Sequence, residues 1–154
     1  MNPCPCGYLG EDRCRCTAEQ VQHYRARISG PLLDRIDIHI EVSAVPYEKL
    51  QSEPEGESSG ELRKQVISAR KLQHQRQACL NKDLSIRSIE QHCALDAQAR
   101  TLLNRAMERL SLSARAYHRI VRLARTIADL AQSDNIESPH LGEEIHLRCL
   151  DRRG

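Results

Sequence analysis

Four cysteines near the start of the chain are the residues best suited to chemistry. The pattern Cys-Pro-Cys-x7-Cys-x-Cys is formed by Cys4, Cys6, Cys14 and Cys16. Four thiolates can close a tetrahedral zinc site with Zn–S distances of about 2.3 Å, and such a site is structural because no coordination position stays open. Gly7 and Gly10 permit a tight turn between the two pairs. The one-residue spacing within each pair departs from the commoner zinc ribbons, and unpaired or redox-active thiols are the alternative.

An arginine between an apolar turn and an alternating apolar segment is the second candidate. Arg35 follows Leu32 and Leu33 and precedes a predicted strand. This position places a guanidinium at the rim of a sheet, where its donors could reach a phosphate across a subunit boundary. From spacing alone, a local ion pair of Arg35 with Asp34 or Asp37 is favoured instead.

Three further arginines share one face of a predicted helix. Arg115, Arg119 and Arg122 are spaced four and three residues apart, so their side chains lie on the same side of that helix. Such a stripe could bind the phosphates of a nucleotide or a nucleic acid. The usual explanation of a basic stripe, however, is a solvated face.

The segments that position these residues read as mainly helical. Apolar periodicity predicts helices over residues 18–28, 59–79, 86–93, 97–110 and 114–131, a short helical turn over 32–35, and a last helix from 138 onward. The residues expected to cap the first five of these helices are Thr17 with Gln20, Ser58 with Glu61, Ser85, Asp96 and Ser113. In the helix over 114–131, the expected core stripe consists of Ile120, Leu123, Ile127 and Leu130. Residues 36–42 alternate strictly between apolar and polar, which predicts a strand buried on one face.

A single strand cannot satisfy its backbone or bury its apolar face alone. We therefore expect the end of an α/β domain over residues 1–50, followed by an all-α domain over 61–154. Residues 51–60 separate them and read as a flexible linker, because they contain proline, glycine, serine and glutamate and no apolar residue.

The amino-acid composition excludes some classes of fold and of binding protein. Phe and Trp are absent, which indicates an aliphatic helical core and argues against single-strand binders that stack bases on aromatic side chains. Cys79, Cys93 and Cys149 fall on helical patterns and should pack as small apolar residues. There is no run of 18 apolar residues and no signal-peptide pattern. We expect a cytoplasmic protein with no membrane partner, and the formal charge of +2 is compatible with nucleic acid as a partner or without it.

Three blocks resemble the ComM/YifB group of magnesium-chelatase-like AAA+ ATPases. They are MNPCPCGY at residues 1–8, YRARISGPLLDRID at 24–37 and LSARAYHRI at 112–120. The likeness extends over nearly the whole chain in family order, and the two longer blocks are the specific ones. It implies the end of an AAA+ core followed by a helical lid domain.

The resemblance also implies residue roles. Asn2 falls at the sensor-1 position, Arg35 at the arginine finger and Arg115 at the sensor-2 arginine of the lid, whereas Arg119 and Arg122 gain no role. The four cysteines match an insertion that the family carries. The implied function is an ATP-driven DNA branch-migration helicase of natural transformation and recombination, working as a homo-oligomeric ring, for which we expect a hexamer, with ATP and Mg²⁺.

One departure from the family pattern is large. A phosphate-binding loop requires Gly-x4-Gly-Lys-Ser/Thr, yet no glycine here is followed by lysine, and no apolar strand ends in Asp-Glu to hold Mg²⁺. Either the chain is a fragment, or it is a truncated reading frame, or a partner supplies these parts, and we expect this chain alone to be catalytically inactive. The alternative function is a zinc-stabilised DNA-binding or interaction module without catalysis.

Overall fold

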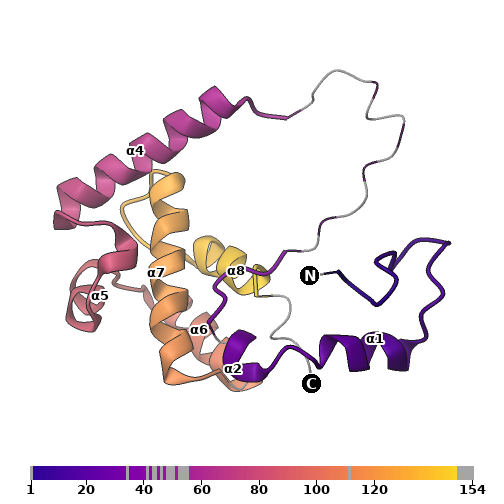
Figure 1. Ribbon diagram of the computed structural model, residues 1–154. Helices are drawn as coiled ribbons and strands as arrows, with labels where there is room; N and C mark the ends of the chain where they lie inside the picture. The colour runs from indigo at the N-terminus through magenta and orange to yellow at the C-terminus, as the bar shows by residue number, and fades with distance from the viewer. Residues whose placement is uncertain are drawn as a thin grey trace. The chain divides into compact units, whose positions relative to one another are not determined.

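The computed structural model is mainly helical (Figure 1). It describes residues 2–33, 35–40, 42, 45, 47, 51, 56–110 and 112–148. The helices are α1 (Ala18–Arg25), α2 (Gly30–Leu33), α4 (Ser59–Gln77), α5 (Ile86–His92), α6 (Ala97–Arg109), α7 (Ala114–Leu130) and α8 (Ser138–His146), with a 3₁₀ turn, η1, over Asn81–Asp83. The chain divides into two compact units, Met1–Ile36 and Asp37–Gly154.

Capping side chains set where the helices begin. Reciprocal capping boxes join Thr17 to Gln20 at α1 and Ser58 to Glu61 at α4, and Ser85, Asp96 and Ser113 accept the expected backbone hydrogen bonds at α5, α6 and α7. These starts confirm the sequence predictions, because a cap is a local interaction worth about 1 kcal/mol. Two details were wrong: α1 ends at Arg25 instead of residue 28, and α2 covers Gly30–Leu33 instead of 32–35. α8 begins at Ser138 as predicted, with Glu137 in the N-cap position.

The predicted strand over residues 36–42 is not formed in the part of this segment that the structure describes. Its backbone contact is an isolated bridge between His39 and Arg148, in which the His39 N–H donates to the Leu147 carbonyl at 2.6 Å. The apolar side chains are exposed, with Ile40 at 67% and Val42 at 85%. A ladder needs a neighbouring strand, and the described residues provide none, so the alternating pattern has no sheet to join.

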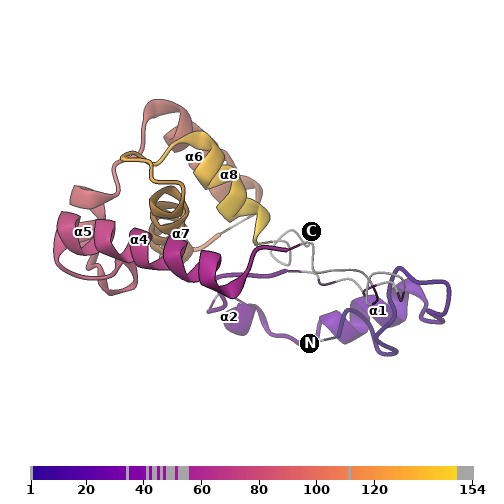
Figure 2. The ribbon, with the colours of Figure 1, turned by 90° about the horizontal axis from the view of Figure 1, so that it is seen from above.

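The second unit is built around α7. This helix packs against α8, α4 and α5, and α8 packs in turn against α6 (Figures 1 and 2). The core is aliphatic, as the composition predicts. It consists of Leu84, Ile89, Cys93, Ala99, Leu103, Ala116, Ile120, Val121, Ala124, Ala128, Ile136 and Leu141.

The buried face of α7 differs from the predicted stripe. Ile120 and Ile127 are buried as expected, but Leu130 is 45% exposed and Leu123 is only half-buried. Alanines at positions 116, 124 and 128 are fully buried and belong to the core. Small side chains let helix axes approach, so the face that packs is set by backbone proximity as much as by bulk. Cys93 is buried and Cys79 packs beside the core as predicted, while Cys149 lies outside the described residues.

The domain boundary predicted at residues 51–60 remains a prediction. Residues 52–55 lie outside the part of the chain that the structure describes, whereas the division of the sequence into two compact units falls between Ile36 and Asp37. No helix among the described residues is both long and apolar enough to cross a membrane.

Candidate functional site

The four cysteines converge in the first unit. The Sγ atom of Cys4 lies 3.4 Å from that of Cys6 and 3.9 Å from that of Cys14, and Cys6 and Cys14 are separated by 3.7 Å. With Cys16 included, all four sulfur atoms lie within 4.8 Å of one another. Ligands 2.3 Å from a tetrahedral zinc ion are separated by about 3.8 Å. The cluster therefore has the dimensions of a four-thiolate metal site.

Two glycines and a helical arginine give the cysteine loop its shape. Gly7 and Gly10 have φ values of +86° and +87°, in the left-handed region that favours glycine. The Gly7 N–H donates to the Cys4 carbonyl at 3.1 Å and closes the first turn. Arg25 of α1 donates through Nε to the Pro3 carbonyl at 3.1 Å, which ties the loop to the helix that follows it.

The electrostatics of the cluster favour one thiolate and disfavour the ionisation of further thiols. The backbone N–H of Tyr8 and the Cys4 thiol lower the pKa of Cys6 to about 6. A hydrogen bond from the Cys6 backbone N–H lowers the pKa of Cys16. Hydrogen bonding to the Cys6 side chain and desolvation outweigh this effect and raise the pKa of Cys16 to about 12. Crowded thiols resist a second negative charge unless a cation compensates it. This donor set therefore suits a divalent metal ion.

Asn2 and Arg35 are both exposed in the first unit. The amide of Asn2 lies beside Gly7, where an added Cβ would come within 3.6 Å of the Asn2 Nδ2 atom. Arg35 donates through Nη1 to the Pro31 carbonyl at 2.5 Å. Its predicted alternative partner Asp37 pairs with Arg119 instead, and Asp34 lies outside the described residues.

The three α7 arginines that were predicted to share one face have different environments. Arg119 donates through Nε to the carboxylate of Asp37, and only 14% of its side chain is exposed. Arg122 donates through Nη2 to the Leu84 carbonyl at 2.6 Å. Arg115, in the first turn of the helix, is exposed and makes no ion pair or guanidinium hydrogen bond with the described residues. A shared solvated face is therefore wrong for Arg119 and Arg122.

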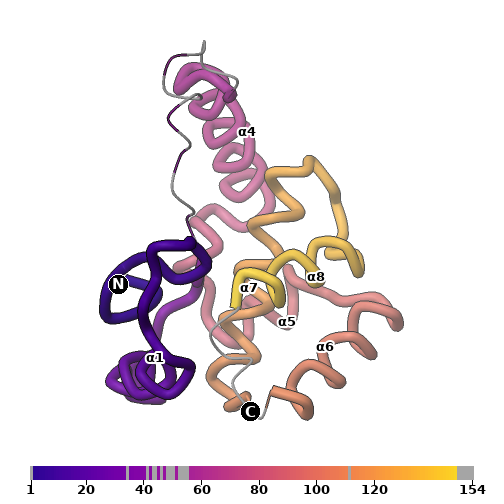
Figure 3. Tube along the Cα trace, turned by 90° about the vertical axis from the view of Figure 1, so that its right-hand side faces the viewer, coloured from indigo at the N-terminus to yellow at the C-terminus, as the bar shows by residue number. Residues whose placement is uncertain are grey.

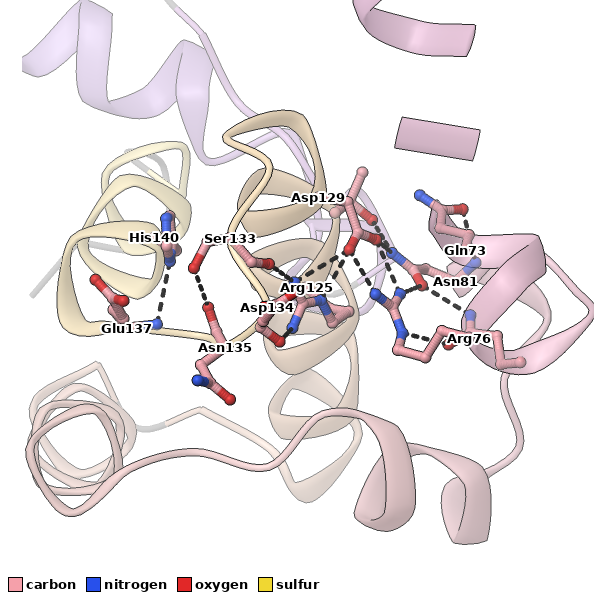
Figure 4. Close-up of polar contacts among 12 residues, drawn as sticks. Gln73, Arg76, Asn81, Arg125, Asp129, Ser133, Asp134, Asn135, Glu137 and His140 are labelled. Atoms are coloured by element: carbon pink, nitrogen blue, oxygen red, sulfur yellow. Dashed lines mark hydrogen bonds and ion pairs between the residues drawn. The ribbon is translucent and has the colours of Figure 1, made fainter. Parts of the chain in front are cut away.

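A buried polar network between α4 and α7 was not predicted (Figure 4). The Asp129 carboxylate accepts from Arg76 at 2.7 and 3.0 Å, from Asn81 at 2.7 Å and from Arg125 at 3.1 Å. Arg125 also donates to the carbonyls of Ser133 and Asp134, at 2.6 and 2.9 Å. An acidic residue on the apolar side of a predicted helix was the available signal, because a buried carboxylate requires cationic partners.

Comparisons with protein families and with known proteins identify the same family over nearly the whole chain. The family described as "Magnesium chelatase, subunit ChlI" matches residues 1–50, and "Magnesium chelatase, subunit ChlI C-terminal" matches residues 56–148. Competence protein ComM of Haemophilus influenzae is 39% identical over 153 residues, and YifB of Salmonella typhimurium is 40% identical over 153 residues. Both alignments cover 99% of this chain and 30% of the relative, so the chain spans less than a third of the length of these relatives. The resemblance in the sequence is thereby confirmed, and the chain belongs to the magnesium chelatase ChlI family, among its ComM- and YifB-like members.

Proposed function

We propose that this chain supplies the arginine finger and the lid of a ComM-like AAA+ ATPase that moves along DNA. Asn2 acts as the sensor-1 residue, Arg35 as the finger toward a neighbouring subunit, and Arg115 as the sensor-2 arginine. The observation that carries the proposal is the environment of Arg115. It is the α7 arginine whose guanidinium is left exposed and unpaired among the described residues, while Arg119 and Arg122 bind within the chain.

The exposed apolar face of residues 36–42 supports the α/β part of the proposal. Ile38, Ile40 and Val42 are 47%, 67% and 85% exposed. A strand carrying these side chains would bury them once neighbouring strands were present, as in a complete AAA+ core. Those strands would also bring the phosphate-binding loop and the Mg²⁺ carboxylates that this sequence lacks.

The proposed chemistry divides between the two arginines. Charge develops on the phosphoryl oxygens during transfer, and a finger that meets this charge lowers the barrier without tightening ground-state binding. A lid arginine contacts the bound nucleotide earlier, so its loss falls more on affinity. A homo-oligomeric ring of six subunits in the cytoplasm would place each finger at its neighbour's ATP and Mg²⁺.

The cysteine cluster holds a structural zinc ion in this proposal. The residues fit the metal, because four sulfur atoms lie within 4.8 Å of one another and the Cys4 side chain is fully buried. Zinc compensates the negative charge of the thiolates and fixes the loop that carries Asn2. With four protein ligands it has no open position for catalysis.

ATP turnover tests the proposal. This chain would replace the matching region of Haemophilus influenzae ComM, and hydrolysis would be measured for Arg115→Ala and for the control Arg105→Ala, which removes an exposed α6 arginine. We expect Arg115→Ala to raise KM for ATP severalfold and lower kcat, and Arg105→Ala to change neither. Equal kinetics for both variants would refute the lid role. Duplex binding by a chimaera without ATP turnover would favour the alternative, a non-catalytic zinc-stabilised module.

A further inference from the structure

The long helix α4 carries mostly positive charge, and this charge is concentrated on one face of the helix. Its 19 residues include one acidic side chain, Glu61, which the capping box with Ser58 already uses. The exposed basic residues are Arg63, Lys64, Arg70, Lys71 and His74. At 100° per residue, these five positions fall within a sector of about 120° that contains no acid.

This basic sector points away from the core. Ala69 and Gln73 are the buried residues of α4, and Arg76 reaches Asp129 on α7. The basic residues lie on the flank and back of the helix relative to these contacts. Figure 3 shows the amino-terminal turns of α4 standing clear of helices α5 to α8 of the same unit, and residues 61–67 are all exposed. The charged face is therefore open to a large ligand.

The same face of α4 contains a shallow depression. Ile67, Arg70, Lys71, His74 and Gln75 line an open depression of about 410 Å³. Two permanent cations and an imidazole thus surround one apolar side chain. A solvated helix face usually mixes charges of both signs, whereas this one collects a single sign around a hollow.

We infer that this face of α4 binds the phosphate backbone of duplex nucleic acid. The basic residues extend over about 16 Å of helix, from Arg63 to His74, which spans more than two successive phosphates of a strand. The sector has no Phe, Tyr or Trp on which bases could stack, so it suits a duplex backbone better than a single strand. Recognition by cations alone is independent of base sequence.

This inference extends the proposed DNA partner to a particular surface. It is separate from Arg35 and Arg115, and it is measured by binding without nucleotide. Either proposal can therefore fail while the other holds.

The test titrates the 154-residue chain into a fluorescently labelled duplex and follows anisotropy from 50 to 300 mM salt. The variant Arg70→Gln/Lys71→Gln removes two charges from the face, and Arg105→Gln/Arg109→Gln removes two exposed charges from α6. Each neutralised phosphate contributes about −0.9 to the slope of log K against log salt. We expect the α4 variant to flatten this slope by about 2 and to weaken binding at 0.1 M salt by about tenfold or more, and the α6 variant to change little.

Several outcomes would overturn the inference. They are absence of duplex binding by the unmodified chain at 50 mM salt, equal losses in both variants, and an unchanged slope in the α4 variant. Binding that depends on Arg70 and Lys71 but is seen only with vesicles containing anionic lipid would assign the face to a membrane surface and also overturn it. Circular dichroism and the melting temperature establish that both variants are folded, and Arg63→Gln/Lys64→Gln at the exposed end of α4 provides a second variant if the first is not.

Discussion

Arg76 of α4 and Asp129 of α7, which are 53 residues apart in the sequence, form a bidentate ion pair with N–O distances of 2.7 and 3.0 Å. The same carboxylate accepts from Asn81 and Arg125 and is only 1% exposed. One buried anion therefore compensates two guanidinium groups and joins α4, η1 and α7. Because α7 also carries Arg115, the network fixes the helix that the proposed nucleotide contact depends on.

Replacing Asp129 with alanine should destabilise the second unit by about 3–5 kcal/mol, because two cations, one of them buried, would lose their counter-ion. Urea unfolding followed by circular dichroism measures the change. The control is Asp83→Ala, since Asp83 is exposed and lies 3.8 Å from Lys82. Removal of such a surface pair should cost less than 1 kcal/mol. Similar losses in the two variants would mean that the network contributes little to stability.

The same carboxylate should make stability fall in acid. Burial raises the pKa of Asp129, but hydrogen bonds from Arg76 and Asn81 outweigh it and leave the pKa below its usual value. Its stabilising effect is thus complete above the unfolded-state pKa of about 3.9 and is lost as the pH falls through the lower folded-state pKa. The difference in melting temperature between the native chain and Asp129→Asn should be largest near neutral pH and shrink below about pH 4. A constant difference from pH 7 to pH 3 would contradict this assignment.

The cysteine cluster should bind one zinc ion per chain. Metal analysis of protein purified without chelators tests the stoichiometry, and Cys14→Ser/Cys16→Ser should abolish binding because two of four ligands are removed. Cys79→Ser is the matched control, since Cys79 packs beside the core of the second unit. Zinc affinity should also fall as the pH is lowered, because protons compete for the sulfur atoms. Full zinc occupancy in the double variant would show that the metal lies elsewhere.

Local interactions explain which parts of the fold were predictable. Thr17, Ser58 and Ser113 cap their helices through contacts within three residues, and such contacts can be recognised from spacing alone. The cysteine cluster was predictable for the same reason, because its four ligands and its glycine turns occupy one short segment.

Contacts between residues far apart in the sequence explain why other predictions were wrong. The alternation of Ile36, Ile38 and Ile40 predicts a buried apolar face, but forming a strand depends on neighbours that the described residues do not provide, and these side chains are exposed. Likewise, the spacing of Arg119 and Arg122 predicts a common face and says nothing of Asp37 or the Leu84 carbonyl, their partners elsewhere in the chain. The partner of a charged residue is set by tertiary structure, which periodicity does not contain.

The final prediction concerns Arg35 in a ring of complete subunits. Arg35→Ala should nearly abolish ATP turnover and leave nucleotide binding mostly intact, because a finger meets charge that is present mainly in the transition state. Fingers in related phosphoryl-transfer systems contribute on the order of 10³–10⁵ in rate. The exposed guanidinium, held here by the Pro31 carbonyl at 2.5 Å, is free to exchange that contact for a phosphate.

Mixed rings separate a finger acting between subunits from an arginine that supports its own subunit. Arg35→Ala subunits are combined with subunits whose phosphate-binding loop is inactivated, each preparation being inactive by itself. If Arg35 acts on its neighbour, some interfaces in the mixture pair an intact nucleotide site with an intact finger, and turnover partly returns. If Arg35 serves only its own subunit, no interface has both parts and none returns. Mass photometry of differently sized subunits establishes that mixed rings form, so that a mixed but inactive ring identifies Arg35 as a structural partner within its own chain.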